Sequence, residues 1–147
     1  MKELEIAEVL KSNVDVLNDI EKSQTYDVYD YYNDVCLIEI KGRHNTKRFP
    51  DAIIEQSKYT RLLKECGGDR HCLYVMNSGR DIYVFDLKQL TRDEYDFGWC
   101  ERGGLPTTTF WNNERTSKNV GYLQWDAAMK VLKYNTKTKK YSLMKTE

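Results

Sequence analysis

Residues 35–41 (Val-Cys-Leu-Ile-Glu-Ile-Lys) constrain the fold more than any other part of this sequence. An apolar run rich in β-branched residues is typical of a strand. The run ends in two charged side chains, Glu39 and Lys41, and the two-residue period of a strand places both on one face. Because a charge buried there is costly unless it is paired or holds a metal, the pattern indicates a carboxylate and an ammonium emerging together from a hydrophobic strand.

A second strand is expected just before it, over residues 26–32, and the Asn-Asp pair that follows supplies the turn. If that turn has two residues, Asp30 opposes Leu37 and lies diagonally next to Glu39, about 7–8 Å or less away. A longer turn would shift the choice of carboxylate towards Asp27. The two strands therefore predict a pair of carboxylates beside one lysine.

The remaining patterns predict helices around a sheet. Expected helices cover residues 2–20 (one long helix, or two broken near 12–13), a segment from Asp51 after Pro50 to Gly67-Gly68, and residues 126–132. Expected strands cover residues 71–76, 81–87 and 119–125, whereas 88–117 is expected to be irregular and the lysine-rich end loosely held. This order predicts an α/β fold, a central mixed β-sheet flanked by helices, in a single domain over residues 1–147.

Composition and charge exclude some classes of protein. The chain has 40% hydrophobic residues and no apolar run of about 20 residues, so a folded domain is expected and a membrane-spanning protein is not. Four cysteines without a Cys-x-x-Cys pair favour reduced thiols and a cytoplasmic location, with Cys36 in the core and a zinc site around Cys66, His71 and Cys72 only weakly indicated. The 23 basic and 23 acidic residues cancel, but residues 130–147 hold six lysines and one acid.

Two carboxylates and a lysine at one place suit metal-assisted hydrolysis of phosphodiester bonds. Mg²⁺ prefers a few carboxylate oxygens and keeps several waters, one of which becomes a nucleophile when the metal makes it more acidic. A neighbouring lysine can orient that water and stabilise the charge that develops on the phosphorus centre. Asp30, Glu39 and Lys41 are therefore the candidate catalytic residues.

Asp30, eight intervening residues and then Glu39-Ile40-Lys41-Gly42-Arg43 resemble the motif of the PD-(D/E)XK, or restriction-endonuclease-like, nuclease superfamily, including its compact phage-type members. The resemblance implies a Mg²⁺-dependent (or Mn²⁺-dependent) DNA endonuclease, with Asp30, Glu39 and the backbone carbonyl of Ile40 as metal ligands and Lys41 as the catalytic lysine. Tyr29 replaces the proline of the motif name, a departure that the family often tolerates. Members that cut both strands are often dimers, so a homodimer is a further expectation.

The resemblance leaves two positions open. The family commonly adds a carboxylate from its first helix, which here is Glu3, Glu5 or Glu8, and sometimes a Gln or Lys from the helix after the motif, which here is Gln56 or Lys58.

Basic residues after the motif predict contacts with DNA phosphates: Arg43, Lys47 and Arg48. Aromatic residues in the irregular segment, including Trp99, are expected to close a core rather than to stack on bases. The alternative function is a catalytically inactive module on the same fold that binds nucleic acid or a protein.

Overall fold

A computed structural model of the chain describes residues 1–24, 28–43, 51–106 and 115–145. The helices are α1 (Glu3–Asn13), α2 (Gln56–Cys66) and α3 (Leu87–Arg92), with two 3-10 helices, η1 (Asp15–Leu17) and η2 (Trp125–Ala127). The strands are β1 (Glu21–Lys22), β2 (Tyr31–Tyr32), β3 (Cys36–Lys41), β4 (Asp51–Glu55), β5 (His71–Ser78), β6 (Asp81–Asp86), β7 (Cys100–Pro106), β8 (Arg115–Gln124), β9 (Lys130–Asn135) and β10 (Lys140–Lys145).

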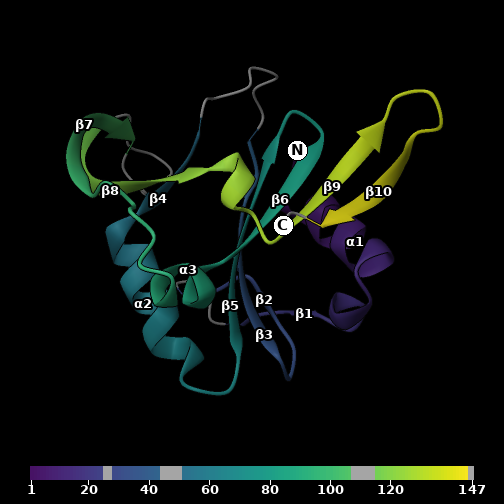
Figure 1. Ribbon diagram of the computed structural model, residues 1–147, viewed down its shortest axis with the longest axis horizontal. Helices are drawn as coiled ribbons and strands as arrows, with labels where there is room; N and C mark the ends of the chain where they lie inside the picture. Colours follow the sequence, from purple (N-terminus) through teal and green to yellow (C-terminus); the bar gives the residue numbers. More distant parts are fainter. Residues whose placement is uncertain (25–27, 44–50, 107–114, 146–147) are drawn as a thin grey trace.

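The described strands form two sheets (Figure 1). One has seven strands in the order β1-β2-β3-β5-β6-β9-β10, and the other has three in the order β4-β8-β7. In the larger sheet β3 and β5 are parallel and the other pairs are antiparallel, so the sheet is mixed. The expected α/β class is confirmed at this level. None of the described helices is long and apolar enough to cross a membrane.

The side chains of β3 alternate between two hydrophobic cores, one on each face of the large sheet. Ile38 and Ile40 pack on the side of α1, and Leu37 packs on the opposite side with Leu62 of α2. All four are at most 1% exposed. Burying apolar side chains of this size contributes about 1.5–3 kcal/mol each, so β3 is held firmly in the centre of the molecule.

The turn between β2 and β3 is longer than the sequence pattern predicts. Tyr32 pairs with Leu37, so four residues separate the paired positions instead of two. Asn33 explains the length, because its Oδ1 accepts the backbone N–H groups of Val35 (3.0 Å) and Cys36 (2.8 Å). A shift of two residues keeps every side chain on its expected face, because the side-chain period of a strand is also two.

The prediction of a helix that begins at Asp51 is wrong for residues 51–55. Asp51–Glu55 is strand β4, whose side chains alternate in burial, and α2 begins only at Gln56. Its partner is β8, where Leu123 opposes Ala52, so the strand depends on a segment about 70 residues away in sequence. Local propensity cannot reveal such a partner. The predicted stop at Gly67 is confirmed by its positive φ of 61°.

The C-terminal third is also more regular than expected. The segment that was expected to be irregular contains α3 and β7, and the helix expected over residues 126–132 is divided between η2 and β9. The lysine-rich end is not loosely held, because β10 pairs with β9 from Lys140–Asn135 to Lys145–Lys130. Lysine is a poor strand former in isolation, so this hairpin depends on its attachment to β6.

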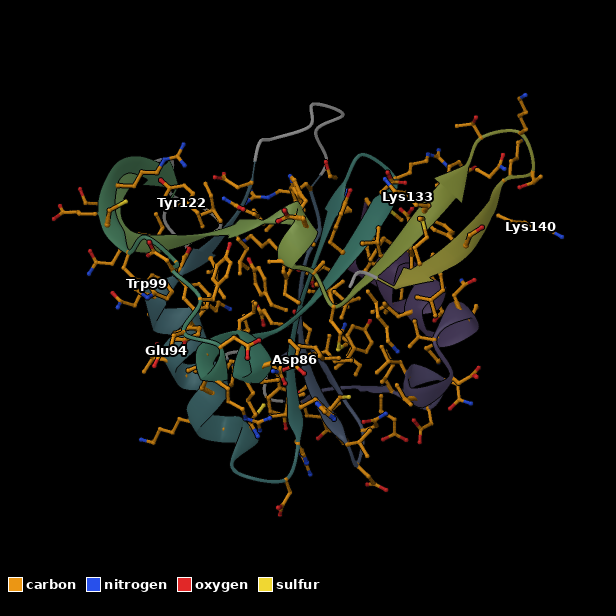
Figure 2. The ribbon with its side chains drawn as sticks, viewed as in Figure 1. Asp86, Glu94, Trp99, Tyr122, Lys133 and Lys140 are labelled. Atoms are coloured by element: carbon orange, nitrogen blue, oxygen red, sulfur yellow. The ribbon has the colours of Figure 1, made fainter. Side chains whose placement is uncertain are left out.

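Two smaller expectations are confirmed. Cys36 is buried in the core on the α1 side. Trp99 stacks on Phe97 with ring centroids 5.0 Å apart and also contacts Tyr59 of α2, so it closes a core beneath the second sheet (Figure 2). Phe97 is 5% exposed, which fits packing better than base stacking.

Candidate functional site

The candidate site lies at the carboxyl end of β3. Glu39 is 6% exposed although it carries a carboxylate, and it lies on the same face of the strand as Lys41. Asp30 reaches this place from the segment before β2, because its backbone N–H donates to the Ile38 carbonyl (2.8 Å) and its Oδ2 accepts the N–H of Ile40 (2.7 Å). The structure thus brings Asp30 directly against the Glu-x-Lys end of the strand.

Lys58 of α2 completes the environment of Glu39. Its Nζ lies 3.0 Å from Glu39 Oε1, and this ion pair joins the helix to the strand. The second carboxylate oxygen, Glu39 Oε2, is buried and has no hydrogen-bond partner among the described residues. A buried oxygen without a partner costs free energy, so the carboxylate is held in place by the fold rather than by full hydrogen bonding.

Burial raises the pKa values of both carboxyl groups, and the charge of Asp30 adds to the rise at Glu39. Burial is the largest effect on Glu39, followed by the charge of Asp30, and together they raise its pKa to about 7 in spite of Lys58. Burial also raises the pKa of Asp30, and the hydrogen bond from Ile40 opposes this rise. Two buried carboxyl groups that influence each other in this way favour one shared proton near neutral pH, and a cation between them would displace that proton.

Glu3 is the acid of α1 that faces this cluster. Burial and then the charge of Asp30 raise its pKa, and Lys41 and Lys58 lower it. Its position follows from the first residues of the chain, where the Met1 nitrogen donates to the carbonyl of Arg43 (2.6 Å) just beyond β3. Of the three candidates in the first helix, the geometry therefore favours Glu3.

The basic residues of the motif are only partly described. Lys41 is exposed at the end of β3, and its charge lowers the pKa of Asp30. The backbone of Arg43 is fixed by Asn77 of β5, whose amide accepts its N–H (2.6 Å) and donates to its carbonyl (3.0 Å). Asp27, Lys47 and Arg48 lie outside the described residues.

The sequence pattern alone missed two residues that shape the site. Tyr74 is paired with Glu39 across the parallel strands, is buried, and donates its hydroxyl to the Ile53 carbonyl of β4 (3.0 Å). Asn77 holds the backbone after the motif, as described above. Both lie in a strand that reads as ordinary core, so only the pairing of β3 with β5 could identify them.

The donor atoms fit a magnesium site in which water molecules complete the coordination. In the described part of the chain, no group of three or more His, Cys, Asp and Glu side chains could hold a metal ion, and this includes the set Cys66, His71 and Cys72. Mg²⁺ needs fewer protein ligands, because it usually keeps several waters and binds through one or two carboxylates. The unpartnered Glu39 Oε2 beside Asp30 meets that requirement.

No protein-family model, curated protein sequence or solved structure matches this chain. The class of the protein must therefore be argued from the chemistry of the site.

Proposed function

We propose that this chain is a Mg²⁺-dependent DNA endonuclease of the PD-(D/E)XK type. One observation carries the proposal: Asp30 and Glu39, from separate segments, meet at the end of a buried strand with Lys41 and Lys58 beside them. Clusters in which burial and like charges raise the pKa values of carboxyl groups are more frequent at functional sites than elsewhere. Glu3 of the first helix adds negative charge near Asp30, although among the described residues these three acids do not form a group that could hold a metal ion.

The residues of the site have separate roles in this proposal. Asp30, Glu39 and the Ile40 carbonyl would hold Mg²⁺ or Mn²⁺, which when bound makes a water more acidic and neutralises phosphate charge. Lys41, exposed at the strand end, orients the attacking water and stabilises the negative charge of the transition state. Lys58 holds one oxygen of Glu39 in place and leaves the other available.

The test is cleavage of plasmid and branched DNA in the presence of Mg²⁺ or EDTA. We expect cutting with Mg²⁺ only, and we expect Lys41→Ala to lower the rate by about 100-fold or more, as loss of a group that stabilises transition-state charge does. Lys64→Ala is the matched control, because Lys64 is an exposed lysine in the last turn of α2. Cutting that survives EDTA, or that is equal in the Lys41 and Lys64 variants, would contradict the proposal.

A catalytically inactive binding module is the second candidate, and the ion pair between Lys58 and Glu39 favours it. This pair neutralises the carboxylate without any metal, as a purely structural pair would. The binding module predicts DNA or protein binding in EDTA that Glu39→Ala leaves unchanged, together with no cutting by the wild type under any divalent cation.

A further inference from the structure

The hairpin formed by β9 and β10 concentrates positive charge in a protein without net charge. Residues 130–145 contain six lysines and no acid, while the whole chain has 23 basic and 23 acidic residues. The hairpin projects from the body of the molecule (Figure 1, yellow). Lys137, Lys139 and Lys140 are exposed near its tip, and Figure 2 shows Lys140 extending away from the rest of the protein.

The pairing of the strands places two of these lysines, Lys133 and Lys140, on the face of the sheet that carries the site. Lys41 is in register with Met76, Met76 with Tyr83, and Tyr83 with Val131. Paired residues point to the same face, as do residues two apart on one strand, so Lys133 shares the face of Glu39 and Lys41.

The direction of the strands places the hairpin tip and the site at the same edge. β5 runs parallel to β3, β6 runs antiparallel to β5, and β9 runs antiparallel to β6. The carboxyl ends of β3 and β9 therefore lie at one edge of the sheet. Strands are about 4.8 Å apart, so β9 lies roughly 14 Å from β3 and β10 roughly 19 Å away. Lys41 is level with Val131, so the end of β9 at Asn135 also lies four residues, about 13 Å, further along the strands, and the tip of the hairpin lies beyond it.

The same face of the hairpin has an open hollow that is lined partly by lysines. Its volume is about 510 Å³, and Lys133, Lys137 and Ser142 are among the residues that line it. Lys133 forms an ion pair with the buried Asp81 (3.3 Å), which fixes its position at one side of the hollow. Among the described residues of the hairpin itself, no acid offsets the other lysines.

One lysine in the turn of the hairpin has a backbone conformation that glycine adopts more easily. Lys139 has a φ of 58°, in the left-handed region that glycine adopts without steric cost. The turn is tight, because Lys139 N–H donates to the Asn135 carbonyl (2.7 Å) and Asn135 Oδ1 accepts the N–H groups of Lys137 and Thr138. Lysines on an edge strand also deter pairing with other chains, but that role does not require lysines in the turn itself.

We propose that the β9–β10 hairpin is a DNA-binding arm that grips the phosphate backbone of a duplex more than about 20 Å from the cut. The location of the cut rests on the proposed function, whereas the grip rests on the hairpin alone. Its ligand is the sugar–phosphate backbone, so recognition by the arm is independent of base sequence. The pairs that join β9 to β6 hold the arm at a set distance from the site.

The test is binding of a labelled duplex of about 20–30 base pairs in EDTA, followed by fluorescence anisotropy over roughly 50–200 mM salt. We expect the triple variant Lys137→Gln, Lys139→Gln and Lys140→Gln to lose at least about tenfold in affinity. We also expect its slope of log K against log salt to be shallower by about 2–3, because each lost phosphate contact removes about 0.9.

The matched control replaces three other exposed basic residues, Arg61→Gln, Lys64→Gln and Arg92→Gln, on α2 and α3. It changes the net charge by the same amount, so we expect its affinity to stay within about twofold of wild type. Equal losses of duplex affinity in the two triple variants would overturn the proposal of a DNA-binding arm. Absence of any duplex binding by the wild type would also overturn it, and an acidic protein would then be the partner to examine.

The two proposals fail differently. If the wild type binds duplex through the hairpin but never cuts it with Mg²⁺ or Mn²⁺, the proposal of a DNA-binding arm is supported and the proposal of a nuclease is contradicted. If the wild type cuts DNA and the hairpin variant binds and cuts as well as its control, the proposal of a nuclease is supported and the proposal of a DNA-binding arm is contradicted.

Discussion

Glu39→Gln is expected to lower Mg²⁺-dependent DNA cleavage by about 100-fold or more and, at the same time, to make the metal-free protein more stable at pH 8. The loss of activity follows from removal of a charged metal ligand. The gain in stability follows from the burial of Glu39, whose side chain is 8% exposed and whose second oxygen has no hydrogen-bond partner in the described part of the chain. A neutral amide of the same shape avoids the cost of that buried charge.

The pH dependence gives the sign of this effect. Burial raises the pKa of Glu39 from 4.5 to about 7, so between these pH values the folded state keeps a proton that the unfolded state has lost. The free energy of unfolding of the wild type therefore falls as the pH rises through this range and levels off above it. The shift, in which the effect of Lys58 is already included, corresponds to a loss of at most about 3 kcal/mol.

The measurement is urea unfolding in EDTA between pH 5 and 8, as rough limits of the window set by the pKa shift. The matched control is Glu55→Gln, because Glu55 forms a similar ion pair with Lys118 (2.9 Å) but is 28% exposed. We expect the stability of the Glu39 variant to lack the wild-type fall with pH and that of the Glu55 variant to retain it. A Glu39 variant that loses stability at pH 8 would argue that the carboxylate is a structural ion-pair partner.

Gly42→Val is expected to destabilise the protein by about 1–3 kcal/mol and to lower cleavage as well. A Cβ at this position would lie 2.4 Å from the backbone oxygen of Met1, and backbone cannot yield as a flexible side chain can. The segment before α1 must therefore move, and Glu3 moves with it, away from Asp30. Thermal unfolding measures the first effect, and the Mg²⁺ concentration required for cleavage measures the second.

Gly68→Val is the control for this change, because a Cβ there would meet no atom of the described residues within 4 Å. We expect this variant to keep the wild-type dependence on Mg²⁺. A Gly42 variant that is destabilised and yet needs no more Mg²⁺ than wild type would separate Glu3 from the candidate site and leave it a role in folding only.

The candidate site was predictable where its residues are close in sequence. Glu39 and Lys41 belong to one strand, so alternation alone places them on one face. Asp30 was identified although the turn was misjudged, because an error of two residues in register preserves the face. The longer turn still brings Asp30 to Ile40, and Asp27, the alternative expected for a longer turn, lies outside the described residues.

Residues from distant elements were not predictable to the same degree. Glu3 and Lys58 were each one of several candidates, because the spacing within a helix does not show which turn faces a strand elsewhere in the chain. The small sheet was missed, since β4 pairs with β8 across about 70 residues. The hairpin of β9 and β10 was missed because its polar strands gain stability from β6 rather than from their own propensity.

The amino-acid sequence by itself determined the central strand, its flanking apolar pattern and the two charges at its end, because side-chain alternation and hydrophobic burial act within a few residues. Only the tertiary structure decided which acid of α1 and which lysine of α2 approach Glu39, and which face the lysine-rich hairpin presents. The physical reason is that these placements depend on long-range strand pairing and on helix packing, which stabilise contacts that no local pattern encodes.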